Sequence, residues 1–343
     1  MSAPTMAFQT YQGIGNREDL EDAFYMISPT QTPFLTMCSR TKATNTLHEW
    51  QTDTLADPGL NSQIEGDDAS GGTSIPSVRY GNYIQNSSKY AVVTDDQEAV
   101  TSAGSINTMA NQVAKRMAEI KLDMEYALVR NYKRSAGSAT VARQLASVES
   151  WLWGSGVANS SGGGTSTLLA VTAGNSITAG SSEATTPSFS SWSASVGGPT
   201  DSSSTSAFAV AHLKKVISNC WTSGGDPQII MVGPVNKQVV SGFAGIATIY
   251  REAGKTAKGT AIIGAADLYV SDFGEHRVIP SRISRDRTAL VLDMDFWSVA
   301  YLRSISQKEI ARTGSAMKRF IDVAYTLVAK NPKSSGKVSD LST

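Results

Sequence analysis

Asp293 and Asp295 are the pair of residues in this sequence whose type and spacing could most directly do chemistry. Two carboxylates can act as acid and base in glycoside hydrolysis, or can bind a divalent cation. Two residues apart on a strand, they would share one face. No third ligand and no His lies near them in the sequence, so a structural role at the end of a strand is favoured.

Asp272-Phe273-Gly274 has the letters of the magnesium-binding motif of protein kinases. A kinase also needs a Gly-rich loop, a strand lysine motif and a catalytic His-Arg-Asp, and this sequence has none of them. A β-turn, with Gly supplying a positive φ, is the better interpretation.

Nucleophilic and phosphate-binding chemistry are not indicated either. His48, His212 and His276 are far apart, and no Gly-x-Ser-x-Gly elbow accompanies them, since residues 242–246 break that pattern. The Gly-rich residues 162–166 lack the Gly-Lys-Ser/Thr of a phosphate loop. We therefore predict no catalytic, cofactor-binding or metal-binding residue, and we do not expect an enzyme.

The composition does not favour nucleic-acid binding by charge, and it fits either a protein that associates or an ordinary domain diluted by one low-charge, Ser/Thr-rich segment. The chain has 343 residues, 30 Lys+Arg and 30 Asp+Glu, so its formal net charge is zero. Only 17% of residues are charged, against a usual share of about 25%. Cys38 and Cys220 stand far apart without metal-ligand spacing, which indicates free thiols in a reducing cytoplasm. The sequence shows neither a secretory leader nor an apolar run long enough to span a bilayer.

A long amphipathic helix is the element on which the rest depends. Between Asn107 and Lys133 no Gly or Pro occurs, and an apolar stripe recurs at helical spacing. The stripe contains Met109, Val113, Met117, Ile120, Met124 and Leu128, and Ile106 and Ala110 extend it backwards. The other face is charged, with Lys121–Glu125 and Lys115–Glu119 spaced to pair one turn apart. Such a helix is expected to be a spine that other elements cross.

Two projections precede this spine. A short helix over residues 16–27, with Asn16 as its N-cap, lies in an amino-terminal arm and is followed by an apolar plug at residues 32–35. Strands are expected over residues 45–55 and 77–95, joined by a polar tip, Ala56–Pro76. Because this hairpin has no continuous apolar face, it must lie on another surface, either of its own domain or of a neighbouring subunit.

The remaining elements follow from periodicity. Thr94-Asp95-Asp96-Gln97 has capping-box spacing. Helices are expected over 141–153 and 206–220, and a turn at Gly233-Pro234 leads into residues 235–243. Strands are expected over 228–232, 265–270, 277–279, 289–293, 297–302 and 319–330, before a polar tail, Lys333–Thr343. Residues 154–205 are rich in Gly, Ser and Thr, with one apolar nucleus at 168–171, and are expected to be either a loop-rich surface insertion or partly disordered.

Several motifs together resemble the major capsid proteins of tailed bacteriophages with the Hong Kong ninety-seven type fold. They are Arg17-Glu18-Asp19-Leu20-Glu21-Asp22-Ala23, Ile27-Ser28-Pro29-Thr30-Gln31-Thr32-Pro33-Phe34-Leu35, Gly224-Gly225-Asp226-Pro227, Ile230-Met231-Val232-Gly233-Pro234 with Lys237, Asp272-Phe273-Gly274, Tyr301-Leu302-Arg303 and Glu309-Ile310-Ala311-Arg312-Thr313-Gly314. The specificity lies in their combined order.

The resemblance implies an α+β fold with six parts. These are an arm (1–43), an extended hairpin loop (44–93), the spine helix with part of a peripheral domain (94–153), the insertion (154–205), an axial domain (206–288), and peripheral strands with a tail (289–343). Some relatives cross-link a Lys to an Asn; Lys42 and Lys89 exist here, but no motif fixes a pair.

The implied function is structural. Copies would assemble as hexamers and pentamers into an icosahedral shell around double-stranded DNA, in the virion, after assembly in the host cytoplasm. A portal protein, and scaffold and decoration proteins, are the implied partners, without a membrane. A tail-tube or decoration protein is the alternative, and a hydrolase with a Ser/Gly-rich lid is a further one, disfavoured by the missing elbow.

Overall fold

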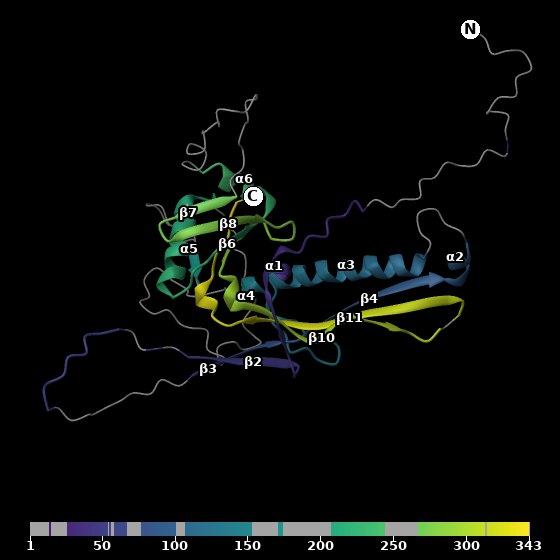
Figure 1. Ribbon diagram of the computed structural model, residues 1–343, viewed down its shortest axis with the longest axis horizontal. Helices are drawn as coiled ribbons and strands as arrows, with labels where there is room; N and C mark the ends of the chain where they lie inside the picture. The colour runs from purple at the N-terminus through teal and green to yellow at the C-terminus, as the bar shows by residue number, and fades with distance from the viewer. Residues whose placement is uncertain are drawn as a thin grey trace, which may run out of the picture.

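The protein has an elongated lobe, a second lobe at one end of it, and a hairpin that projects below both (Figure 1). The computed structural model describes residues 14, 26–53, 55, 58–66, 77–100, 107–152, 171–173, 207–243, 267–312 and 314–342. Among these residues no helix has the length and apolarity needed to cross a membrane.

The elongated lobe is a four-stranded sheet with one long helix along one face (Figure 1). The strand order is β1-β10-β11-β4, in which β1 runs parallel to β10 and the other pairs are antiparallel. Its elements are β1 (Ser39–Lys42), β4 (Gln85–Thr94), β10 (Trp297–Glu309), β11 (Ala316–Ala329), α1 (Pro33–Met37), α2 (Asp95–Ala99), α3 (Thr108–Val129) and α4 (Val148–Trp151).

The predicted spine helix is α3, and it is shorter than expected. The side chain of Asn107 accepts from the backbone N–H of Ala110 and caps the first turn. The helix ends at Val129, four residues before the predicted end, because Arg130 is extended and its Nε donates to the carbonyl of Ile283 in the second lobe. Of the predicted stripe, Met109, Ile120, Met124 and Leu128 are buried, and Val113 and Met117 are partly buried. Ala110 is exposed, so the stripe does not extend back through it.

The predicted Lys121–Glu125 pair is wrong. Glu125 is fully buried, and its two carboxylate oxygens accept the backbone N–H groups of Phe34 and Leu35 at 2.8 and 2.7 Å. A carboxylate thus holds the first turn of α1, where backbone donors have no partner within the helix. The side chain of Glu119 contacts Arg116 and Lys89.

The second lobe is a six-stranded sheet in the order β5-β12-β9-β6-β8-β7. Its central strands bury both faces, since Met231 packs into the core of the elongated lobe while Ile230 and Val232 pack under α5. The lobe comprises β5 (Val171–Ala173), α5 (Val210–Thr222), β6 (Ile229–Val232), α6 (Pro234–Ser241), β7 (Leu268–Ser271), β8 (Gly274–Pro280), β9 (Ala289–Leu292), η2 (Met294–Phe296), η3 (Pro332–Ser334) and β12 (Gly336–Val338).

Near the carboxyl terminus one prediction is wrong, and one strand lies in a different sheet from β10 and β11. Residues 333–343 are not simply a polar tail: β12 pairs with β5 and β9, and Val338 and Leu341 are buried. Strand β9, expected among the peripheral strands, lies in the six-stranded sheet. The path of the chain explains both observations. The chain leaves the second lobe after β9, forms β10 and β11 in the elongated lobe, and then returns to the second lobe as β12.

The helix predicted over residues 141–153 is also wrong in length, since only Val148–Trp151 is helical. Leu145, Val148, Trp151 and Leu152 are nevertheless fully or almost fully buried. Short segments without regular structure fill the core here. The apolar residues that predicted a helix are therefore explained by their burial in the core.

The projecting hairpin consists of β2 (Leu47–Thr52) and β3 (Val78–Tyr83). The second predicted strand splits at Ile84, because β4 leaves the hairpin and pairs with β11. The base of the hairpin lies on its own subunit. Asn82 exchanges hydrogen bonds with Ala146, and Trp50 Nε1 donates to the carbonyl of Ala329 at 2.9 Å.

The predicted arm is partly integrated in the elongated lobe. Phe34 and Leu35, the apolar plug, are buried in the subunit's own core, and β1 joins its sheet. Of the helix predicted over 16–27, residues 16–25 lie outside the described residues, and Met26 and Ile27 are not helical.

Candidate functional site

The acidic pair predicted from the sequence is structural. Asp293 ends β9 and caps η2, accepting the backbone N–H of Asp295 at 3.3 Å and that of Asp226 at 3.1 Å. The two carboxylates do not share a strand face, because the chain turns into η2 between them. Burial raises the pKa of Asp293, and the two backbone donors act in the opposite direction.

The three histidines lie in separate places. His212 accepts from the backbone N–H of Ala209 at the start of α5, and His48 lies on β2. His276 on β8 is buried, and its Nδ1 is hydrogen bonded to the carbonyl of Pro227 while its Nε2 lies 2.7 Å from Ser271 Oγ. With Nδ1 as the donor to Pro227, Nε2 accepts a hydrogen bond from Ser271 Oγ. The sequence alone does not predict this contact, because the two residues become neighbours only across the β7–β8 hairpin.

The contact between Ser271 and His276 stabilises the turn that joins β7 to β8. It does not make Ser271 a nucleophile. Ser271 Oγ also accepts from Phe273 N and lies 3.2 Å from the carbonyl of Gly274. Gly274 has a φ of 144°, as the turn interpretation of Asp272-Phe273-Gly274 requires. Within the described residues no group of three metal-ligating side chains occurs. The Gly-rich residues 162–166 lie outside the described residues.

Lys42 and Lys89, the two lysines named above for cross-linking, differ in their surroundings. Lys89 Nζ lies 2.9 Å from Asp123 and 3.6 Å from Glu119, which raises its pKa through the hydrogen bond to Asp123. Lys42 is exposed on the edge strand β1. Among the residues that the structure describes, no geometry fixes a Lys–Asn pair.

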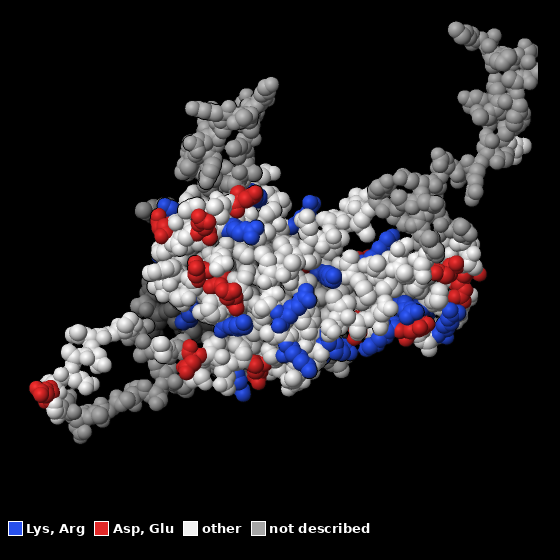
Figure 2. Space-filling model, viewed as in Figure 1, with Lys and Arg blue, Asp and Glu red and all other residues white. Residues whose placement is uncertain are grey.

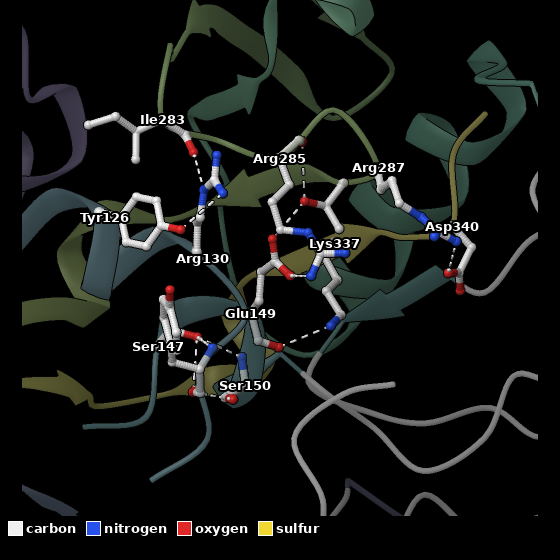
Figure 3. Close-up of polar contacts among 12 residues, drawn as sticks. Tyr126, Arg130, Ser147, Glu149, Ser150, Ile283, Arg285, Arg287, Lys337 and Asp340 are labelled. Carbon is white, nitrogen blue, oxygen red and sulfur yellow. Dashed lines mark hydrogen bonds and ion pairs between the residues drawn. The ribbon is translucent and has the colours of Figure 1, made fainter. Parts of the chain in front are cut away.

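A buried polar cluster joins the two lobes (Figure 3). The carboxylate of Glu149, on α4, accepts from Thr288 Oγ1 at 2.7 Å and lies 3.5 Å from Arg285. Lys337 Nζ, on β12, donates to the backbone carbonyl of Glu149 at 3.0 Å. The cluster therefore fixes α4 of the elongated lobe to both the loop before β9 and the carboxyl-terminal strand.

Large apolar side chains are exposed in several places among the described residues, and two of these places lie on the projecting loop and on the four-stranded sheet. Leu55, Leu60 and Ile64, between β2 and β3, are 82–97% exposed. On the face of the four-stranded sheet away from α3, Tyr90 and Val92 are also exposed, and the Tyr90 ring contacts that of Phe320 at 5.0 Å. Exposed apolar groups that lie together are typical of protein–protein contacts.

Charged residues of both signs lie on the face shown in Figure 2. Lys and Arg lie along the lower margin of the elongated lobe with acidic atoms among them, and acidic atoms also lie at the far end of the projecting loop. These cations come from strands far apart in the chain and become neighbours only in the sheet, where Asp322 lies close to Arg303 and Lys308. The best candidate functional site is therefore a pair of surfaces, the projecting loop and the outer sheet face.

Comparison with known proteins agrees with a structural role. A family model described as SU10 major capsid protein matches residues 4–342. The major capsid protein of Escherichia phage Phieco32 is 24% identical over 371 residues, which cover 98% of this chain and 97% of that protein.

Solved capsid structures share this architecture. The cyanophage A-1(L) capsid asymmetric unit has a TM-score of 0.66 at 12% identity, covering 98% of this chain and 99% of that one. The capsid of the native GTA particle has a TM-score of 0.59 at 10% identity, covering 97% of this chain and 98% of that one. At these identities the similarity shows the fold.

Proposed function

Because this chain belongs to the SU10 major capsid protein family, we propose that many copies assemble as hexamers and pentamers into an icosahedral shell that encloses packaged double-stranded DNA. The fold is the predicted Hong Kong ninety-seven type, and the predicted identity as a major capsid protein of the phage virion is confirmed. The observation that carries the proposal is the family match over nearly the whole chain.

The surfaces of the isolated subunit support assembly. The loop between β2 and β3 exposes Leu55, Leu60 and Ile64, while the hairpin base packs on the subunit's own core. A heterologous contact of this kind generates closed rings when its rotation closes. A subunit held by several such contacts gains effective concentration, so that each contact can be modest.

In this proposal the DNA is held by containment, which the zero formal net charge of the chain supports. Binding through phosphates needs a basic excess and depends steeply on salt. A portal protein, a scaffold and decoration proteins complete the proposed particle, which assembles in the host cytoplasm, where the two free buried cysteines stay reduced. Catalysis has no part in this function.

The sheets to which the strands belong change the proposed division of the subunit in one respect. The arm, extended loop, spine, axial and peripheral parts keep their roles as proposals. Strands β9 and β12 are assigned to the axial part, since both lie in its six-stranded sheet.

Negative-stain electron microscopy of the purified chain tests the function. We expect closed shells from the full chain, and we expect a variant lacking residues 56–76 to remain a folded subunit that forms none. Circular dichroism and thermal melting check that the variant folds. Tubes in place of shells would indicate a tail-tube protein, and normal shells from the deletion variant would show that the loop has no role in assembly.

A further inference from the structure

Residues 145–152, which include α4, form a short segment in which every residue is at most 4% exposed. The polar groups of this segment lie out of reach of bulk water, so they need partners within the protein. These partners belong to three separate parts of the subunit. We name residues 145–152 the junction segment.

The first part that the junction segment contacts is the base of the β2–β3 hairpin. Asn82 of β3 is fully buried, and its Oδ1 accepts the backbone N–H of Ala146 at 2.9 Å while its Nδ2 donates to the carbonyl of Ala146 at 3.1 Å. The ring of Trp151 lies 5.4 Å from that of Trp50 on β2 and 6.2 Å from that of Tyr80 on β3, measured between ring centroids. Both strands of the hairpin are thus attached to the junction segment.

The second part is the chain that leaves the spine helix. The backbone N–H of Ser147 donates to the carbonyl of Tyr132 at 3.0 Å, and the backbone N–H of Tyr132 donates to Ser147 Oγ at 3.0 Å. Ser150 Oγ donates to the same carbonyl at 2.6 Å. The position of the junction segment relative to the end of α3 is therefore fixed by several hydrogen bonds.

The third part is the second lobe (Figure 3). The carboxylate of Glu149 accepts from Thr288 Oγ1, and the backbone carbonyl of Glu149 accepts from Lys337 Nζ. Thr288 directly precedes β9, and Lys337 lies in β12, which pairs with β9. Thr288 and Lys337 are both buried. The junction segment thus holds two neighbouring strands of the six-stranded sheet.

The hairpin and the second lobe are therefore anchored to one short stretch of backbone. If the hairpin base moves, either Ala146 moves with it or the buried amide of Asn82 loses its partners. If Ala146 moves, the buried contacts of Glu149 are disturbed in turn. Because an unpaired buried polar group is costly, we expect these parts to keep one arrangement together.

We propose that the junction segment couples the β2–β3 hairpin to the second lobe, so that a contact that displaces the hairpin base also loosens the second lobe, and the reverse. This goes beyond the proposed function, since it describes a single copy and holds whether or not copies form shells. The coupling is reciprocal, because each side changes the other by the same free energy. Packed side chains and buried hydrogen bonds with discrete arrangements are the kind of network that carries such a coupling.

Hydrogen exchange of the full chain, followed by mass spectrometry, tests the coupling. Asn82→Ala removes the hydrogen bonds between the hairpin and the junction segment, and we expect amide exchange at least tenfold faster in β9 and β12 as well as in β3. The matched control is Thr326→Val. It removes the hydroxyl that donates to the carbonyl of Tyr83, a hydrogen bond of the hairpin base that does not involve the junction segment, and it should leave exchange in β9 and β12 unchanged.

The reverse direction is tested from the second lobe. Thr288→Val removes the hydroxyl that donates to Glu149, and we expect amide exchange at least tenfold faster in β3 as well as in β9. The matched control, Ser271→Ala, removes a hydroxyl of the same lobe at the turn between β7 and β8 and should leave exchange in β3 unchanged. Light scattering checks that all variants are compared in the same assembly state.

The outcomes decide the proposal. Faster exchange only on the side of the substitution, in either direction, would overturn the coupling. An equal rise on the far side in the two controls would also overturn it, because general destabilisation would then explain the effect. If Asn82→Ala fails to fold by circular dichroism, Gln85→Ala replaces it under the same criteria, since it removes only a 3.4 Å contact with the backbone N–H of Leu145. Shell formation is tested separately, by electron microscopy of the unchanged chain.

Discussion

Glu125 shows how a single side chain can join two distant segments. It lies on the spine helix, yet it accepts the backbone N–H groups of Phe34 and Leu35, ninety or more positions earlier in the chain. Its helical position alone suggested a solvated charge. Only the docking of α1 makes the carboxylate useful, because two buried backbone donors would otherwise lack a partner.

We expect Glu125→Ala to lower the free energy of unfolding by about 2–4 kcal/mol, because it leaves two buried N–H groups without an acceptor. Urea denaturation measures the change. Glu119→Ala, at a partly exposed ion pair, is the control and should change it by less than about 1 kcal/mol. Equal effects from the two substitutions would contradict this role.

The same residue predicts a pH dependence. Burial raises the pKa of Glu125, while hydrogen bonds from Leu35 and Phe34 lower it in part. A raised folded-state pKa means that the folded state binds the proton more tightly, so this stabilisation is complete below the unfolded pKa and is lost as pH rises through the folded pKa. Glu125→Gln cannot titrate, so the wild type should lose stability relative to it as pH rises. A constant difference across the range would count against a raised pKa.

Both thiols should be inert in the folded protein. Burial raises the pKa of Cys220 to about 12, and burial with the nearby Glu125 also raises the pKa of Cys38. At about pH 8 a thiol with such a pKa is roughly 0.01% thiolate, the reactive form. We expect a thiol reagent to label neither residue until denaturant unfolds the chain. Ser304→Cys, at an exposed position on β10, is the labelling control, and rapid labelling of the wild type would contradict the prediction.

At the scale of elements, amphipathic periodicity identified the interior but not always its geometry. Most of the stripe of α3 is buried or partly buried, and β11 is buried from Ile321 onwards. Residues 145–152 have the same apolar density, yet they form mainly irregular chain with one short helix. Periodicity reports which side chains are buried, whereas the backbone path depends on the neighbouring segments.

The carboxyl-terminal strand gives a sharp test at this scale. Truncation after Lys330 removes β12 from between β5 and β9 and removes the buried Leu341, so we expect an insoluble or unfolded product. Truncation after Leu341 removes only two residues and should fold normally. Sedimentation and circular dichroism distinguish the outcomes. A soluble, folded product from the chain that ends at Lys330 would mean that β12 is dispensable.

At the scale of the whole molecule, the cluster around Glu149 makes two lobes unfold together. Arg285→Ala removes the guanidinium beside a buried carboxylate, which should lower the free energy of unfolding by about 3 kcal/mol or more. We expect the wild type to unfold in a single calorimetric transition, and we expect this transition to broaden or split in the variant. Arg282→Ala, at an exposed position in the same segment, should leave one sharp transition. An unchanged transition in Arg285→Ala would show that the lobes are held together elsewhere.

The sequence by itself determined the spine helix, the projecting hairpin, the free thiols and the membership of a capsid family. These follow from local information, because helical and strand periods, turn residues and ordered motifs can be read within short windows.

The tertiary structure alone decided which charges meet. Glu125 and Asp293 became buried acceptors, β12 entered a sheet, and Lys308 and Lys318 came to lie on one face with Tyr90 of a distant strand. The physical reason is that electrostatic and hydrogen-bond partners are set by distance in space, and strand pairing joins segments more than two hundred residues apart. The zero net charge of the composition does not show which charged side chains lie together in the folded chain.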